Sequence, residues 1–428
     1  MKARAALFQW MWLGATVGVA CGSASAAFLL LLERATVFRE SHEYVIYTLP
    51  LAGALIGLVY ERWGASIKGG TNLVIETLHE NAPQVPLRMA PMVLVGTVLT
   101  HLFGGSAGRE GTAVQMGASL ADEIAHRFRV SRDTRRQLLS AGIAGGFGSV
   151  FGTPIAGAVF GLEVVTIGRM EYDALVPALV ASVVGDFVTR RLGVMHTAYP
   201  QLPHVELTAL VLGKLCVVAV GMALATVAFV ELTQGLKRRL EAKLHRLPAR
   251  MFVGGITLVA MWKLIGTSDY LGLGVPTIVR AFSDPSLPWF SFAAKLVFTA
   301  VTLAAGFLGG EVTPLFFVGA TLGSILARVL GLPIELGAGV GIAAVFGAGA
   351  NTPVALSIMA IELLGGAAFP HVAIVAVIAY VLSGHRGIYP AQRLLRRKHG
   401  GAHFAEPIPL RDYRKSLPAD PASPDVPD

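Results

Sequence analysis

Residues 104–117, GGSAGREGTAVQMG, place an arginine and a glutamate in a glycine-rich run between two strongly apolar segments. The apolar run that follows Glu110 predicts a helix, which puts residues 108–112 at its amino terminus. Free N–H groups and the positive end of the helix dipole make such a terminus a binding place for an anion. The Glu110 carboxylate can itself occupy this anion-binding site, and it vacates the site for a mobile anion when it is protonated or displaced. Glu110 is therefore predicted to be both the plug of an anion path and a proton carrier.

Two other interpretations of the same run imply different chemistry. Glu110 could be paired with Arg109 in a solvent-exposed loop, although acidic residues inside a membrane usually have a function. The run also contains G-x-S-x-G, so Ser106 could be the nucleophile of an intramembrane serine protease. Such a protease needs a histidine from another helix, but His101 is too near in sequence and His371 has no supporting acid nearby. A transporter is therefore favoured over an enzyme, and the 11 histidines show no metal-ligand spacing, so neither a metal nor a cofactor is expected.

The composition indicates a polytopic membrane protein. Hydrophobic residues make up 54% and charged residues 14% of the 428 residues, whereas soluble domains carry about 25% charged residues. The mean hydropathy is +0.62. The net charge of +8 is concentrated in residues 127–136, 237–250 and 385–415, which by the positive-inside rule face the cytoplasm. No soluble binding module separates these basic runs, so no nucleic-acid partner is expected.

The apolar segments predict an all-α protein with broken helices. The first segment continues past Cys21 without a break and is expected to be a retained helix rather than a cleaved signal peptide. Several others are too short to cross about 30 Å of hydrocarbon. Glycine and proline interrupt them, which is typical of transporters whose helices end inside the membrane. The predicted segments are 7–33, 43–60, 86–103, 134–166, 173–190, 206–235, 250–267, 287–305, 313–330, 335–347, 352–364 and 369–383.

An internal repeat of about 200 residues relates the two halves of the chain. FGTPIAGAVFGLE matches GANTPVALSIMAIE, with Glu163 opposite Glu362, and GREGTAVQMGASL matches GGEVTPLFFVGATL, with Glu110 opposite Glu311. Such repeats build transporters whose substrate site lies between the halves near the membrane midplane. The residues alone leave open whether the halves are parallel or inverted. We interpret Glu163 and Glu362 as structural end groups of small-residue helices.

The ordered motifs resemble the CLC family of anion channels and anion/proton antiporters over nearly the whole chain. They are GREG at 108–111, FGTPIAGAVFGLE at 151–163, GGEVTP at 309–314 and Tyr389 in GHRGIYPAQ. The resemblance implies a CLC-type inverted repeat of broken and tilted helices and one anion pathway per subunit. It also implies a homodimer whose interface includes the small-residue helices of the two matched Thr-Pro segments.

Departures from the chloride-handling members resemble the fluoride/proton antiporter branch of that family. Thr112 stands where those members have proline, KGGTNLVIE at 68–76 stands where they have GSGIP, and Glu311 and Thr313 lie in a motif that reads GGIFAP in them. Val164 replaces the inward glutamate of the chloride antiporters. Fluoride holds its water tightly, so its site needs close, strong donors. The resemblance therefore implies fluoride export in exchange for protons, with a chloride channel or chloride/proton exchanger of the same fold as the alternative.

The resemblance also implies roles for single residues. Asn72 would donate to the central anion, or Thr71 if the motif shifts by one residue, although Asn72 could instead cap a helix. Glu311 would relay protons or hold Glu110 or fluoride by a hydrogen bond, unless it is only a capping carboxylate. Tyr389 would line the inner path through its O–H, unless it is an interfacial tyrosine. The implied proton-transfer residues are Glu110 and Glu311, and the implied anion-binding set is Asn72, Thr71, Gly70, Arg109, Gly111, Thr112, Val312, Thr313 and Tyr389.

The expected organisation has two membrane repeats, 1–172 and 173–400. Residues 401–428 are expected to form a short cytoplasmic tail that is disordered, because its end is rich in proline and acidic residues, and no regulatory domain is expected. We expect a multi-pass protein of the bacterial inner membrane with both termini in the cytoplasm. Its expected partners are fluoride and protons as substrates, the lipid bilayer and a second copy of the chain.

Overall fold

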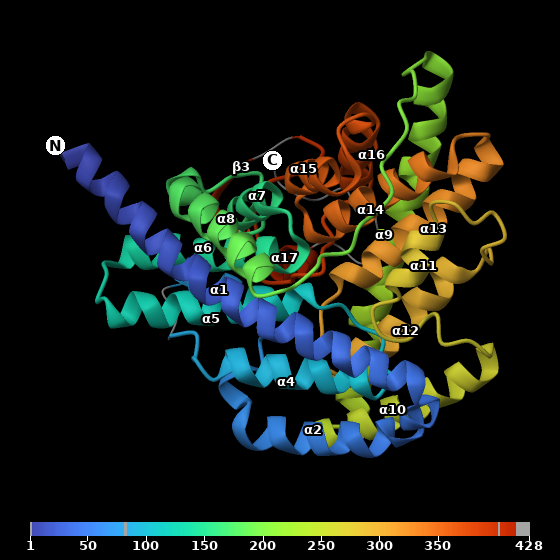
Figure 1. Cartoon of the computed structure of the whole chain (residues 1–428), viewed down its shortest axis with the longest axis horizontal. Helices are drawn as coiled ribbons and strands as arrows, with labels where there is room; N and C mark the ends of the chain where they lie inside the picture. Colours follow the sequence, from blue (N-terminus) through green and yellow to red (C-terminus); the bar gives the residue numbers. More distant parts are fainter. Residues whose placement is uncertain (1, 81–83, 401–402, 417–428) are drawn as a thin grey trace.

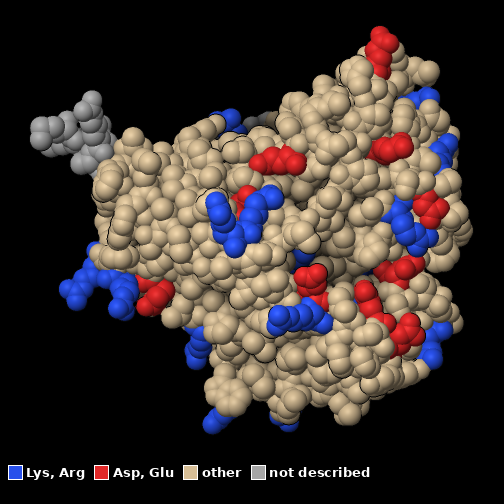
Figure 2. All heavy atoms as spheres, in the orientation of Figure 1, with Lys and Arg blue, Asp and Glu red and all other residues tan. Residues whose placement is uncertain are grey.

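The computed structural model describes residues 2–80, 84–400 and 403–416. The described chain is mostly helical (Figure 1). Charged side chains are sparse on the face that Figure 2 shows. Six helices in the described residues are long and apolar enough to cross a membrane, and six shorter apolar helices accompany them. The prediction of a polytopic all-α membrane protein is confirmed.

The first half contains eight helices, some of them too short to span a bilayer. Its elements are α1 (Lys2–Ser41), the 3-10 turn η1 (Glu43–Thr48), α2 (Leu49–Trp63), η2 (Ala65–Ile67), α3 (Thr71–Glu80), α4 (Met89–Leu102), α5 (Glu110–Arg127), α6 (Arg132–Phe151), α7 (Pro154–Glu163), η3 (Tyr172–Ala174) and α8 (Leu175–Arg191).

The second half repeats this order of long and short helices. Its elements are α9 (Ala209–Lys243), α10 (Leu247–Ile265), α11 (Val275–Arg280), α12 (Ser291–Ala305), α13 (Val312–Leu330), α14 (Ile334–Ala350), α15 (Pro353–Leu364) and α16 (Phe369–Leu382). Three short strands and a last helix complete the described chain, namely β1 (Thr166–Ile167), β2 (Arg393–Arg396), β3 (His403–Pro409) and α17 (Leu410–Ser416).

Helices α5 and α13 start beside each other in the middle of the molecule and run to opposite faces (Figure 1). The end of α5 lies at the start of α1, where the rings of Phe128 and Trp12 are 4.9 Å apart. The end of α13 lies on the side of the molecule where α1 ends (Figure 1), and Arg328 there donates to carbonyls of the 281–290 connection. The two halves are therefore inverted relative to each other, as the resemblance implied.

Two boundaries expected from the sequence differ from those of the structure. The segment expected at 134–166 is broken into α6 and α7, because Gly152 adopts a left-handed φ of 74° and Pro154 begins a new helix. The boundary of the first repeat, expected at residue 172, precedes α8, which packs with first-half helices. Helix α8 packs against α1 and α6, just as α16 packs against α9 and α14 in the second half.

Residues 403–416 are ordered, so the prediction of a disordered tail is wrong for them. Strand β3 pairs antiparallel with β2, which pairs in parallel with β1 after α7. Leu394 of β2 and Leu410 of α17 are buried together with Ile167 of β1, and this small core stabilises the sheet. The remaining part of the expected tail, residues 417–428, lies outside the described residues.

Glu163 and Glu362 each bind the start of the helix that matches their own in the other half. The Glu362 carboxylate accepts from the backbone N–H groups of Ile155 and Ala156 at 2.9 and 2.7 Å, at the start of α7. The Glu163 carboxylate accepts from two backbone N–H groups at the start of α15, at 3.1 and 2.8 Å. A carboxylate at a helix amino terminus satisfies free N–H groups and favours the helix dipole. These contacts agree with the interpretation of both acids as structural groups.

Candidate functional site

Two glycine-rich loops, one from each half, bring the starts of α5 and α13 together. Gly108 and Gly310 exchange backbone hydrogen bonds, with N–O distances of 2.6 and 2.8 Å. A Cβ atom on Gly108 would lie 2.8 Å from Glu110 Oε2 and 2.9 Å from the Gly310 carbonyl oxygen. The close approach of the two loops therefore requires glycine at this position. Two helix amino termini, each with free N–H groups, face one space.

The Glu110 carboxylate fills that space and is fully buried. Its Oε2 accepts from the backbone N–H of Arg109 at 3.0 Å and from that of Thr313 at 3.2 Å. The Thr313 hydroxyl donates to Oε1. Arg109 Nε lies 3.7 Å from Oε1, which is an ion-pair distance. Donors from both halves thus converge on one negatively charged group, and the same donors could hold a small anion in its place.

Gly111 and Val312 lie in the first turns of α5 and α13, close to this carboxylate. Their backbone N–H groups belong to the helix starts, whose first N–H groups have no partner within the helix. Val312 is buried, and a Cβ atom on Gly111 would lie 3.1 Å from Gly310 Cα. The two residues expected to contribute backbone donors therefore line the space that Glu110 occupies.

Asn72 lies in the first turn of α3 and binds the segment that contains Tyr389. Its Oδ1 accepts from the backbone N–H of Ala391 at 3.0 Å. Because the oxygen faces that N–H group, the Nδ2 donors point away from it. The Thr71 hydroxyl accepts from Gln115 Nε2 at 3.2 Å. Both side chains accept in these contacts, so the Asn72 amide and the Thr71 hydroxyl each keep a donor, and the choice between them for the central position stays open.

Gly70 and Tyr389 lie on either side of Asn72. Gly70 precedes α3 with a left-handed φ of 55° and approaches the Gln115 amide. Tyr389 is buried and within electrostatic range of both Glu110 and Glu311. The sequence motifs that lie far apart along the chain thus surround one region between the halves.

Thr112 lies two residues after Glu110, and Glu311 matches Glu110 in the internal repeat. The surroundings of both side chains differ from those of the Glu110 carboxylate. The Thr112 hydroxyl pairs with that of Thr97 at 2.6 Å, and both residues are buried between α4 and α5. Glu311 precedes α13 and makes no side-chain cap to that helix. It is only partly buried and lies within electrostatic range of Lys237 and Glu110. The capping alternative for Glu311 therefore has no hydrogen bond in its favour.

Gln392 is a buried residue of this region that the sequence did not single out. Its Nε2 donates to the carbonyls of Val164 and Ala350 at 2.8 and 2.7 Å, and its Oε1 accepts from Asn351 at 2.9 Å. The amide thereby fixes the Tyr389 segment against the ends of α7 and α14. No local pattern identifies such a residue, because all its partners are distant in sequence.

The protease interpretation has no supporting geometry. Ser106 is buried, and its hydroxyl is paired with that of Thr299 at 3.0 Å rather than with a histidine. The His101 ring bonds to the carbonyls of Thr97 and Ala107. Among the described residues, the buried His371 ring has no hydrogen-bond partner. A serine nucleophile needs a base within reach, so this arrangement does not support hydrolysis.

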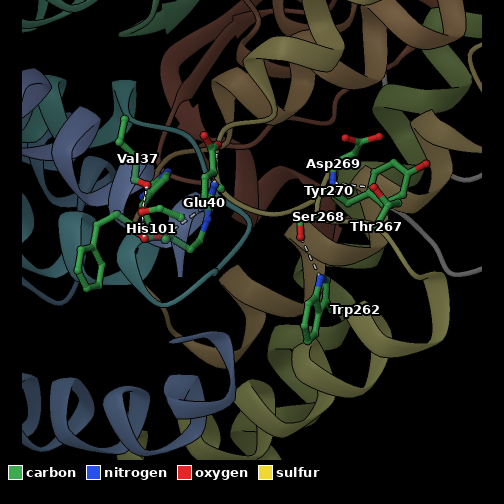
Figure 3. A network of polar contacts seen from close by, with 12 residues as sticks. Val37, Glu40, His101, Trp262, Thr267, Ser268, Asp269 and Tyr270 are labelled. Atoms are coloured by element: carbon green, nitrogen blue, oxygen red, sulfur yellow. Dashed lines mark hydrogen bonds and ion pairs between the residues drawn. The ribbon is translucent and has the colours of Figure 1, made fainter. Parts of the chain in front are cut away.

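A cavity of about 560 Å³ opens beside Arg109. The end of α1, with Arg39 and Glu40, forms one wall, and the segment from Ser268 to Thr277 forms the opposite wall. Figure 3 shows this arrangement, with Glu40 and His101 on one side and Ser268, Asp269 and Tyr270 on the other. Of the residues around Glu110, Arg109 lines this cavity.

Several known proteins are similar to this chain. The family model described as "Voltage gated chloride channel" matches residues 52–384. The chain is 49% identical to the "Chloride/fluoride channel protein" of Pseudomonas syringae pv. tomato, over 95% of this chain and 91% of that protein. It is 27% identical to the "H(+)/Cl(-) exchange transporter ClcA" of Vibrio vulnificus, over 82% and 81%. A solved CLC-type fluoride/proton antiporter superposes with a TM-score of 0.88 at 36% identity, covering 91% of this chain and 98% of the other.

Proposed function

This chain belongs to the voltage gated chloride channel family, and we propose that it is an antiporter that exports fluoride in exchange for inward protons. The observation that carries the proposal is the buried Glu110 carboxylate. It accepts hydrogen bonds from both halves of the chain and so occupies the proposed anion-binding site. The likeness to a solved fluoride/proton antiporter supports fluoride as the anion. The family has a transporter fold rather than an enzyme fold.

In the proposed cycle, a proton neutralises Glu110 and weakens its hold on the donors of Arg109 and Thr313. The neutral side chain leaves, and fluoride takes its place between the two helix starts. Short hydrogen bonds from charged or strongly polarised groups compensate the lost hydration of fluoride. The Thr313 hydroxyl and the Asn72 amide supply such donors, together with N–H groups at Gly111, Val312 and the helix starts.

Glu311 and Tyr389 have supporting roles in this proposal. Glu311 either relays protons or donates a hydrogen bond to Glu110 or fluoride when it is protonated. The Tyr389 hydroxyl lines the inner part of the path, and its segment is held by Asn72 and Gln392. Thr112 acts through its contact with Thr97 in α4 rather than as an anion ligand in the state described.

Chloride is the second candidate anion. Relatives named as chloride channels and as a chloride/proton exchanger cover most of the chain. The fold is shared with a slow cyanobacterial Cl⁻/H⁺ antiporter at a TM-score of 0.77 and 17% identity. The residues that distinguish the two candidates are Thr313 and Asn72, whose donors suit the more strongly hydrated ion.

The proposed assembly is a homodimer in a bacterial inner membrane, in line with the bacterial relatives. Helices α7 and α15 pack against each other and expose Ile155, Val354 and Ile361 on one apolar surface. An apolar surface of this kind fits a second copy of the chain. The mass of the purified protein in detergent tests this proposal.

Purified protein in liposomes tests the function directly. Fluoride efflux measured with an electrode is expected to be far faster than chloride efflux from matched vesicles, and external alkalinisation is expected to accompany it as protons enter. Glu110→Gln cannot carry a proton, so it is expected to abolish proton-coupled turnover. Equal efflux of both halides would contradict the fluoride assignment, and full proton coupling in Glu110→Gln would contradict the role of Glu110.

A further inference from the structure

Helix α12 carries a buried polar stripe that the proposed cycle does not use. Lys295, Thr299 and Thr302 lie at positions i, i+4 and i+7, so they share one face of the helix. All three are fully buried. A charged side chain inside a membrane protein is costly and usually has a function.

The Lys295 ammonium group is held by backbone carbonyls and one aromatic ring. Nζ donates to the carbonyls of Gly272 and Tyr270 at 2.7 and 3.2 Å. It also lies 5.4 Å from the centre of the Phe317 ring, in a cation–π contact. No carboxylate lies within ion-pair distance of Lys295 among the described residues. Carbonyl oxygens and a ring face, rather than an acid, therefore hold the Lys295 side chain.

The two threonines of the stripe hold the loop that leads to Glu110. Thr299 pairs with the Ser106 hydroxyl at 3.0 Å, and the Thr302 hydroxyl accepts from the Ser106 backbone N–H at 3.1 Å. The Gly272 N–H donates to the Gly105 carbonyl at 3.1 Å. Through these contacts the stripe binds the 103–109 loop and the 266–274 segment to each other.

Arg39 of α1 is a second buried basic side chain near the contacts made by Lys295, Thr299 and Thr302. Its Nη1 donates to the His101 carbonyl at 3.2 Å, and its Nη2 bonds to Glu40 at 3.3 Å. Glu40 is more than half exposed, whereas Arg39 is buried. Lys295 and Arg39 are within electrostatic range of each other. Figure 3 shows Ser268, Asp269 and Tyr270 of the 266–274 segment across from Glu40 and His101, and both this segment and Arg109 line the cavity.

We propose that Lys295 is a positioning residue for the Glu110 gate. Its amino group holds the 266–274 segment. That segment bonds through Gly272 to Gly105, so Lys295 keeps the 103–109 loop that leads to Glu110 in position. The inference rests on the proposed function, because the gate is the step that Lys295 serves.

The test compares Lys295→Met with Lys295→Arg in liposomes, with fluoride and proton movement recorded together. Methionine keeps the length and apolar contacts but removes the charge and the donors. The coupled rate of Lys295→Met is expected to fall about tenfold, because hydrogen bonds from a charged donor are among the stronger contacts. The number of protons moved per fluoride is expected to fall as well. Lys295→Arg is expected to keep the wild-type proton/fluoride ratio, because it keeps N–H donors for the Tyr270 and Gly272 carbonyls.

Two threonine variants test the inference even if Lys295→Met does not fold. Thr299→Val removes the contact with Ser106 and is expected to lower the proton/fluoride ratio in the same direction. Thr321→Val is the matched control, since the Thr321 hydroxyl donates to carbonyls of its own helix, at Phe317 and Val318. Thr321→Val is expected to keep the wild-type ratio.

A wild-type proton/fluoride ratio in Lys295→Met would overturn the inference, and so would an equal loss in Lys295→Arg and Lys295→Met. If Lys295→Met does not purify as a folded protein, an unchanged ratio in Thr299→Val overturns it. Wild-type protein that moves chloride with protons would contradict only the proposed anion, because the same ratio can then be measured with chloride.

Discussion

At the scale of single residues, the site depends on donors that approach Glu110 from both halves of the chain. Arg109 belongs to the helix start of the first half and Thr313 to that of the second. Among the described residues, the Thr313 side chain is the one hydroxyl that donates to the carboxylate. Backbone N–H groups are common to all helix starts, so this hydroxyl is the feature that side-chain substitution can remove.

Thr313→Val tests that hydroxyl. Valine has nearly the same shape but no donor, while the Thr313 backbone N–H remains. Coupled fluoride efflux is expected to fall about tenfold, because a hydrogen bond to a charged group contributes about 1.5–3 kcal/mol. Thr313→Ser keeps the donor and serves as the control. The measurement is the initial efflux rate on a fluoride electrode, and equal rates for Thr313→Val and wild type would exclude a role for the hydroxyl.

At the scale of elements, Glu163 and Glu362 join the two halves through the starts of α7 and α15. Each carboxylate accepts two backbone N–H groups of the opposite helix. Both helices begin at a Thr-Pro pair, and proline fits the first turn of a helix because it lacks an N–H group. The repeat visible in the sequence thus becomes a reciprocal contact in the structure.

Glu362→Ala tests the contribution of this contact to stability. The substitution leaves the N–H groups of Ile155 and Ala156 without their acceptor, and the loss of a helix cap costs about 0.5–2 kcal/mol. We expect a lower unfolding temperature in detergent. Glu206→Ala, in an exposed connection, is the control and is expected to leave that temperature unchanged. A matching unfolding temperature for the two variants would show that the cap does not stabilise the fold.

The sequence predicts the elements of this site better than the contacts among them. The helix start at Glu110, the second start near Glu311 and the broken segments all follow from local patterns of glycine, proline and apolar residues. The Thr97–Thr112 pair, the Gln392 amide and the contact of Ser106 with α12 do not, because they join residues brought together only by tertiary packing. The ordered tail was missed for the same reason, since its core includes β1.

At the scale of the whole molecule, each end of the described chain lies close to a basic loop or helix end. The start of α1 lies beside Phe128, at the basic loop that follows α5. Near the end of the described chain, Arg414 bonds to Glu231 and Gln234, close to the basic end of α9. The 281–290 connection lies against the end of α13, away from these two contacts. If the basic loops face the cytoplasm, both ends of the chain do as well.

Cysteine labelling in intact cells tests this topology. Cys216 is exposed on the apolar helix α9 and would be replaced by serine, whereas Cys21 is buried and can remain. Ser283→Cys, in the 281–290 connection, is expected to react with a membrane-impermeant thiol reagent applied from outside. Arg132→Cys, at the start of α6, is expected to react only after the membrane is permeabilised. Both positions are exposed, so access across the membrane, rather than burial, determines the result, and the reverse pattern would mean that the basic loops face outward.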